Sequence, residues 1–388
     1  MKAPTGRYET IRTGDEEYRA FVPDPLPPPA ALITSRELSA ATERAALALG
    51  RLDGAAHVLP NTDLLLYSCV RKEAVLSSQI EGTQSTLSDL LRHELGAAPA
   101  VPLDDIAETS NYVAAVNMAF EQIASPTGLP LCNRLLRDAH AIVLRSGRGA
   151  EKLPGEFRTS QNWIGGSRPG TARFVPPPPH LLGESMSHLE SFLHDSADGF
   201  PALVRSGLAH VQFETIHPFL DGNGRVGRML IVLALHNAEV LRTPLLYVSL
   251  HFKRNRHEYY ELLDRVRQRG DWEQWLLFFM DAVTVAADDA TNASRRLRAA
   301  FDADRARLHD LGRVSGSTAR VHDALTARPV LDIATAAELA GFAVTTATHA
   351  LERLCGMGIA HELTGQRRNR LFAYTEYLDI LGEGTEPL

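Results

Sequence analysis

The chain has 388 residues, of which 44% are hydrophobic and 22% are charged, and its formal net charge is −7. This composition is typical of a globular protein with two or three domains, and the charge does not by itself point to a nucleic-acid or membrane partner. Its three cysteines are too widely spaced for a disulfide framework or a metal cluster, and the first residues contain no apolar signal segment. The apolar run from Met229 to Leu235 is far shorter than the ~20 residues that span a bilayer, so we expect a cytoplasmic protein.

The proline-rich stretch at 21–29 cannot continue a helix, so residues 1–30 are predicted to form an irregular arm. Residues 225–237 are apolar on nearly all sides, which predicts a buried helix. Gly82 is a plausible C-terminal stop for the helix that precedes it. The other segments with a helical pattern are 36–51, 62–80, 104–125, 130–146, 180–196, 200–216 and 256–310.

Two parts of the chain depart from this helical pattern. Between 154 and 179, glycine turn signals separate short runs of β-prone residues, which predicts a β-hairpin on the surface of a helical domain. After Gly316, helical patterns at 317–328, 333–340 and 344–357 are followed by β-like runs at 359–363 and 370–375. Three helices and a two-stranded ribbon predict a winged helix-turn-helix domain in a mainly α protein.

The segment from His217 to Arg228 combines residue types that suit phosphate chemistry. A glycine-rich turn at 221–224 leads into the predicted buried helix. Glycines let a ligand approach the backbone, and the free N–H groups of a helix N-terminus form an anion site. Arg225 and Arg228 can bind phosphate oxygens, and Asp221 is a hard oxygen ligand suited to Mg²⁺. His217 can accept a proton near neutral pH.

Together these residues indicate a transfer reaction at phosphorus. An anion cradle with Mg²⁺ would hold a nucleoside triphosphate, while a neutral imidazole takes the proton from a hydroxyl that attacks phosphorus. A lone histidine at a helix end, or a lone Gly-Asn-Gly turn, is usually structural. The occurrence of His217, an acidic residue, this turn and two arginines within twelve residues favours chemistry over that reading.

Residues 217–228 resemble the signature of the Fic family, His-x-Phe-x-Asp/Glu-Gly-Asn-Gly-Arg-x-x-Arg, at every specified position. The likeness extends upstream through 210–216 and to the Pro-Gly-Glu-Phe-Arg run at 154–158, and it covers about residues 20–290. The resemblance implies a Fic-type helical core with a small β-hairpin flap. It also implies transfer of AMP from ATP to a Ser, Thr or Tyr hydroxyl of a target protein or of the enzyme itself, with pyrophosphate as the leaving group.

The resemblance further implies a role for each matched residue. His217 would be the general base, Asp221 would bind the Mg²⁺ that bridges the α- and β-phosphates, Arg225 would support the phosphates, and Arg228 would hold the γ-phosphate. The other expected nucleotide-site residues are Glu81, Ile164, Gly165, Gly222, Asn223, Gly224, Gly227, Tyr259 and Tyr260. Of these, Asn223 and the glycine amides would bind the α-phosphate, and the two tyrosines could equally be ordinary core or surface aromatics. The hairpin residues could align a target peptide by strand addition.

Ser77, Glu81 and Gly82 lie at the end of a predicted helix, and the first two share a face because they are four residues apart. They resemble the inhibitory Ser/Thr-x-x-x-Glu-Gly/Asn motif of Fic proteins, in which the glutamate pairs with the second arginine of the signature. This implies that Glu81 occupies Arg228, so that ATP binds with misplaced phosphates and attack on the α-phosphorus is slow. The same glutamate could instead position a water that removes AMP, and the sequence does not separate these two directions.

With this resemblance, we expect an N-terminal arm and inhibitory helical region at 1–100, a Fic catalytic core at 101–290, a helical linker at 291–315 and a winged-helix domain at 316–388. Arg367, Arg368 and Arg370 on the predicted wing raise the question of DNA binding. Residues 313–388, however, contain seven Arg or Lys against nine Asp or Glu, a net charge of −2, and so lack a basic footprint. Protein contact, homodimerisation or target presentation is therefore favoured for this part.

Two alternatives remain beside protein AMP transfer. The first is a winged-helix DNA-binding regulator with a nucleotide-sensing site, although a sensor does not need a base such as His217 beside its phosphate cradle. The second keeps the fold but transfers UMP, phosphocholine or the γ-phosphate. The glycine turn and both arginines fit a triphosphate held in the usual direction, so ATP is the expected co-substrate.

Overall fold

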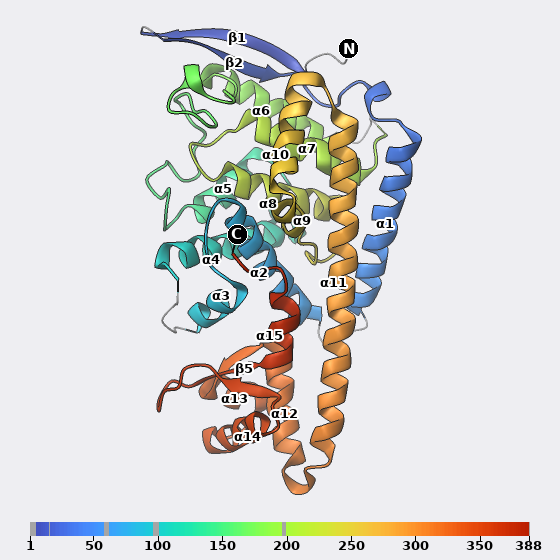
Figure 1. Cartoon of the computed structure of the whole chain (residues 1–388), viewed down its shortest axis with the longest axis vertical. Coiled ribbons are helices and arrows are strands. Elements are labelled where there is room, and N and C mark those ends of the chain that lie inside the picture. Colours follow the sequence, from blue (N-terminus) through green and yellow to red (C-terminus); the bar gives the residue numbers. More distant parts are fainter. Residues whose placement is uncertain (1–4, 15, 58–61, 96–100, 196–198, 388) are drawn as a thin grey trace.

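The computed structural model describes residues 5–14, 16–57, 62–95, 101–195 and 199–387. The chain is mostly helical and elongated in this view, and the long helix α11 runs along much of its length (Figure 1). The helices are α1 (Arg36–His57), α2 (Thr62–Ile80), α3 (Leu87–Glu94), α4 (Leu103–Ala124), α5 (Asn133–Val143), α6 (Pro179–His194), α7 (Ala202–Ile216), α8 (Asn223–Asn237), α9 (Ser249–Arg254), α10 (Arg256–Arg269), α11 (Trp272–His309), α12 (Ser315–Ala327), α13 (Ile333–Ala340), α14 (Val344–Gly356) and α15 (Thr375–Gly382). The strands are β1 (Gly6–Thr13), β2 (Glu16–Pro23), β3 (Val330–Asp332), β4 (Ala360–Glu362) and β5 (Leu371–Tyr374).

The N-terminal segment is not the irregular arm that the sequence predicted. β1 and β2 form an antiparallel hairpin in which Gly6 lies opposite Pro23 and Thr13 lies opposite Glu16. The proline run begins only where β2 ends, so it limits the hairpin without preventing it. Tyr18 and Ala20 of β2 are buried against Val175, and this packing supplies the apolar face that a two-stranded hairpin needs for stability.

The large hydrophobic core lies where α7 and α8 pack against each other and against α2, α4, α5 and α11. α8 is buried at every position from 225 to 233, which confirms the prediction of a helix enclosed on all sides. α2 spans 62–80 as predicted, and Gly82, with φ 102°, follows its end. α3 was not predicted, although Thr86 and Asp89 form a capping box at its start, a signal that the sequence carries.

The segment between 154 and 179 forms the flap that the sequence predicted, but not a regular hairpin. Its two arms are joined by one isolated antiparallel bridge between Ile164 and Phe174, and a short 3-10 turn at Pro169–Thr171 lies at its tip. Two glycines with positive φ and Pro169 lie near the tip, and four prolines at 176–179 follow the second arm, so few residues are able to extend the ladder. The N-terminal hairpin braces the flap, since Glu16 accepts a hydrogen bond from the Gly170 N–H.

A second hydrophobic cluster joins α12, α13, α14 and α15 of the C-terminal part to one end of α11 and to Leu87 and Leu91 of α3. The predicted helices and the two predicted strands are present, and an unpredicted strand joins them to give an antiparallel sheet of order β3-β5-β4. The winged helix-turn-helix identity of this part stays a prediction. Its end returns toward α2, where the Gln79 side-chain N–H donates to the carbonyl of Thr385 over 2.7 Å (Figure 1).

Candidate functional site

The residues of the phosphate motif are held in place where α7 ends and α8 begins. His217 caps α7 in the left-handed conformation, with φ 50°, and Gly222, with φ 76°, precedes α8. A histidine in this conformation is strained and needs support from its surroundings. Arg158, which is buried, supplies it by donating to the carbonyl of His217 over 2.9 Å, and Asn162 donates to the same carbonyl over 3.3 Å.

The loop between His217 and α8 is closed by its own side chains. The Asn223 amide accepts a hydrogen bond from the Phe219 N–H and donates one to the Phe219 carbonyl, both over 2.8 Å. Because the Asn223 side chain is used in this closure, its backbone N–H is the group that an anion could still reach. Asp221 Oδ1 accepts from the Gly222 N–H over 2.6 Å, and the Asp221 side chain is 44% exposed.

His140 joins this loop to the start of the flap, a role that the sequence did not indicate. Its ring stacks on Phe219 with centroids 3.7 Å apart, and its Nδ1 accepts from the Gly155 N–H over 2.8 Å. The proton therefore sits on Nε2, which donates to the Asp221 carbonyl over 3.0 Å. Burial lowers the pKa of His140 to about 4, so the ring is neutral at pH 7.

Arg225 binds a carboxylate on a neighbouring helix. Its guanidinium pairs with the buried carboxylate of Glu108 on α4 over 3.1 Å, and Glu108 also binds Arg148 over 2.7 Å. Arg225 lies 4.0 Å from Asp221 Oδ1. This network fixes the start of α8 to α4. The predicted contact between Arg225 and a phosphate stays a prediction.

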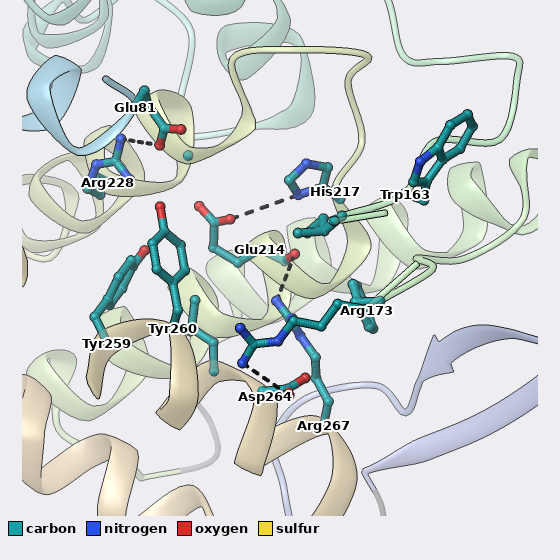
Figure 2. Close-up of a pocket in the computed structure, with 15 residues that line it drawn as sticks. Glu81, Trp163, Arg173, Glu214, His217, Arg228, Tyr259, Tyr260, Asp264 and Arg267 are labelled. Atoms are coloured by element: carbon teal, nitrogen blue, oxygen red, sulfur yellow. Dashed lines mark hydrogen bonds and ion pairs between the residues drawn. The ribbon is translucent and has the colours of Figure 1, made fainter. Parts of the chain in front are cut away.

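A cavity of about 490 Å³ opens between the motif, the end of α2, the flap and α10 (Figure 2). It brings together eight of the predicted site residues: Glu81, Ile164, Gly165, His217, Gly224, Arg228, Tyr259 and Tyr260. The lining residues that the sequence did not indicate are Trp163, Arg173, Phe174, Glu214, Leu263, Asp264 and Arg267. The predicted residues that do not line it are Ser77, Gly82, Asp221, Gly222, Asn223, Arg225 and Gly227.

His217 lines this cavity with a ring that is 19% exposed. Its Nδ1 is buried and has no hydrogen-bond partner among the described residues. Burial lowers the pKa of His217 to about 3, and the positive charges of Arg267 and Arg158 lower it further, while Glu81 opposes them. The imidazole is therefore neutral at pH 7, the form that can accept a proton.

Arg228 is fully buried, and the end of α2 holds its guanidinium. It donates to the Glu81 carboxylate over 2.7 Å, to the Ser77 hydroxyl over 2.8 Å and to the Ser77 carbonyl over 2.9 Å. Burial opposes the charge of Arg228, yet Glu81 raises its pKa above the ordinary value. Gly224 makes the close approach of Glu81 possible, because a Cβ at this position would lie 2.1 Å from Glu81 Oε1.

The two tyrosines have different surroundings. Tyr259 is buried, and its hydroxyl is 2.9 Å from Nε2 of His210, so it belongs to the core as well as to the cavity wall. Tyr260 is partly exposed, and Figure 2 shows its hydroxyl directed into the cavity. Burial raises the pKa of Tyr260 to about 12, so it remains a neutral hydrogen-bonding group at pH 7.

Two parts of the chain match known protein families. Residues 39–121 match the Fic/DOC family N-terminal description, and residues 130–235 match the Fic/DOC family. Protein adenylyltransferase Fic of Aedes aegypti is 36% identical over 135 residues, which are 34% of this chain and 24% of that protein. A protein of Aquifex aeolicus named probable protein adenylyltransferase is 35% identical over 111 residues, 29% of this chain and 30% of that protein. The match thus covers less than a third of either relative.

Solved structures share the fold. A Fic family protein from Desulfovibrio desulfuricans G20 has a TM-score of 0.56 at 19% identity, covering 88% of this chain and 96% of that one. Fic-1 from C. elegans has a TM-score of 0.51 at 20% identity, covering 66% of this chain and 72% of that one. The family matches run from α1 to α8 and include the motif loop and α2, and these parts of the chain therefore belong to the Fic family.

Proposed function

We propose that this protein transfers AMP from ATP to a hydroxyl side chain of a protein, and that Glu81 holds the enzyme mostly inactive. One observation carries the proposal: the neutral imidazole of His217 and the buried guanidinium of Arg228 line one cavity, and Glu81 pairs with Arg228. The adenylyltransferase names of the relatives from Aedes aegypti and Aquifex aeolicus support the same reaction class.

In the proposed reaction, the acceptor hydroxyl gives its proton to His217 as its oxygen forms a bond to the α-phosphorus. The bond between the α-phosphorus and the bridging oxygen breaks, and the electron pair leaves with pyrophosphate. The N–H groups at the start of α8 would stabilise the negative charge that builds up on the α-phosphate. Arg228 would bind the γ-phosphate and thereby place the α-phosphorus in line with the acceptor.

Asp221 fits the role of a magnesium ligand for this reaction. Its side chain is 44% exposed, and among the residues that the structure describes only the Gly222 N–H donates to it, at Oδ1. Arg225 lies 4.0 Å from that same oxygen. Among the described residues, no three His, Cys, Asp or Glu side chains gather into a protein-only metal site. Magnesium commonly binds one or two carboxylates together with substrate phosphates, a pattern that one carboxylate beside a triphosphate site meets. The ion would neutralise phosphate charge.

The inhibition follows from competition for Arg228. The guanidinium already donates to Glu81 and to both oxygens of Ser77, so a γ-phosphate must displace the carboxylate to reach it. ATP bound without that contact would have its α-phosphorus out of line with the acceptor, and the transfer would be slow. The serine and the glutamate of the predicted inhibitory motif thus act on the same arginine.

The experiment compares the wild type, Glu81→Gly and the double variant Glu81→Gly/His217→Ala, each incubated with α-³²P-labelled ATP and Mg²⁺. We expect strong protein labelling by Glu81→Gly, weak labelling by the wild type and none by the double variant. Equal labelling of the wild type and Glu81→Gly would refute the inhibition. Absence of labelling in all three, with cell lysate supplied as a source of targets, would refute AMP transfer.

Two controls resolve the donor and the direction. ATP labelled on the γ-phosphate labels protein only if the γ-phosphoryl group is transferred, and α-labelled UTP tests for UMP transfer. Protein that carries labelled AMP, incubated with unlabelled wild type, loses its label only if Glu81 supports AMP removal. Retention of the label assigns Glu81 to inhibition alone.

A further inference from the structure

A second titratable side chain faces His217 across the floor of the cavity. Glu214 lies one helical turn before His217, at the end of α7, and its Oε2 is 3.9 Å from Nδ1 of His217 (Figure 2). The two side chains are only 7% and 19% exposed. Nδ1 of His217 and Oε1 of Glu214 are each buried and have no hydrogen-bond partner among the described residues. Buried polar atoms without a hydrogen-bond partner are rare in a folded protein, and here two of them belong to neighbouring side chains.

Gly227 of α8 makes room for the Glu214 carboxyl group. A Cβ on Gly227 of α8 would lie 2.3 Å from Glu214 Oε1, so only glycine accommodates the carboxyl where the two helices meet. The Gly227 carbonyl is bonded to Nδ1 of His210 over 2.8 Å, which fixes this part of α8. Gly227 therefore has a packing role in addition to its place in the motif.

The charges around Glu214 come from three helices, and none of them neutralises its carboxyl group directly. Arg228 of α8 is bonded to Glu81 and Ser77 at the end of α2. Arg267 of α10 donates to the Glu214 carbonyl over 3.3 Å and to a neighbouring hydroxyl, not to the carboxyl oxygens. Burial raises the pKa of Glu214 to about 7, and Arg228 and Arg267 oppose the rise while Glu81 adds to it.

The surroundings make His217 a weak base without help. Burial and the positive charges of Arg267 and Arg158 lower the pKa of His217, while the charge of Glu81 and the backbone of Glu214 act in the opposite direction. The second ring nitrogen of His217, Nε2, is on the edge opposite Nδ1, so contact at Nδ1 leaves Nε2 for a substrate proton. In serine proteases, a buried carboxylate fixes the tautomer of the catalytic histidine and stabilises its protonated form in the same way.

We propose that Glu214 is the positioning residue of His217: its carboxylate accepts a hydrogen bond from Nδ1–H and stabilises the imidazolium formed when Nε2 takes the acceptor proton. This inference rests on the proposed AMP transfer, in which the acceptor O–H bond breaks, the oxygen–phosphorus bond forms and pyrophosphate leaves with the electron pair. A shift of about 1 Å closes the gap between Glu214 and His217 to hydrogen-bond distance.

The kinetic test compares Glu214→Gln and Glu214→Ala in the Glu81→Gly background. Glutamine keeps an acceptor oxygen without the charge, and alanine removes both. We expect kcat for AMP transfer to fall by about 10²-fold in Glu214→Gln, with a larger fall in Glu214→Ala, while the Kd for ATP measured by calorimetry changes less than about twofold. In the parent, kcat should rise with pH as Glu214 ionises, and Glu214→Gln should lose this rise.

A second measurement does not depend on turnover. In protein with ¹⁵N-labelled histidine, the signals missing from His217→Ala identify His217, and we expect the Nδ1-protonated tautomer when Glu214 is present and a mixture in Glu214→Ala. Gly227→Ala, which displaces the carboxyl without changing its charge, should resemble Glu214→Ala. If Glu81→Gly transfers no AMP, the proposed function fails and the tautomer still decides the pairing. An unchanged tautomer, or a Glu214→Gln enzyme with the parent's rate and pH profile, overturns the inference.

Discussion

The ion pair between Glu81 and Arg228 makes a prediction about stability that does not require any enzymatic activity. Glu81→Gln keeps the shape of the side chain but removes the charge that faces a fully buried guanidinium at 2.7 Å. A hydrogen bond to a charged group contributes ~1.5–3 kcal/mol, and we take the lower end because the Glu81 side chain is 35% exposed and partly screened. A loss of ~1.5 kcal/mol lowers the unfolding midpoint by ~3 °C or more for a domain of this size.

The assay is scanning calorimetry of the wild type and Glu81→Gln, with and without ATP and Mg²⁺. Without nucleotide the variant should unfold at the lower temperature. With saturating nucleotide the difference should shrink or reverse, because a γ-phosphate replaces the lost carboxylate and binding to the folded state is stabilising. Glu43→Gln, at an exposed position of α1, serves as the matched control and should show neither effect.

The difference in unfolding midpoint between the wild type and Glu81→Gln depends on pH in a defined direction. Burial raises the pKa of Glu81, but the charge and the hydrogen bond of Arg228 outweigh it, so the pKa of Glu81 is lowered from its ordinary value of 4.5. The folded state therefore favours the ionised form, and the stabilisation is present above pH 4.5 and fades as the pH falls through the lowered value. An equal midpoint for Glu81→Gln and the wild type at pH 7, or equal gains from ATP in both, would refute the competition for Arg228.

Three further outcomes are expected. Arg158→Lys should lower the rate of AMP transfer in the Glu81→Gly background at least about tenfold, because lysine lacks the planar fork that spans the carbonyls of His217 and Pro177. Circular dichroism should show that the fold is retained. A rate equal to that of the parent would contradict this prediction. Asn223→Ala loses two hydrogen bonds of ~1 kcal/mol each, so calorimetry should show a lower midpoint and weaker ATP binding. Iodoacetamide should modify Cys355 well before Cys69, whose pKa burial raises to about 12, and mass spectrometry that finds equal rates would exclude this order.

Local patterns in the sequence predicted much of the helical structure. The apolar run of α8 and the bounds of α2 follow from periodicity and from a glycine stop, which depend on residues close together in the chain. The N-terminal hairpin was missed because the irregular structure expected for the proline run was extended to all of residues 1–30. Its stability depends on Val175, which lies far away in the sequence.

The sequence by itself determined the chemistry available at the site: a histidine, a glycine turn and two arginines within twelve residues. Only the tertiary structure decided which of these groups meet. Arg225 and Arg228 are alike in the motif, yet the first pairs with Glu108, 117 residues away, and the second pairs with Glu81, 147 residues away. Glu214 is present in the sequence, but the burial of its carboxyl beside His217 depends on the packing of α7 against α8. Local spacing carries no information about such contacts, because they form only when distant helices pack together.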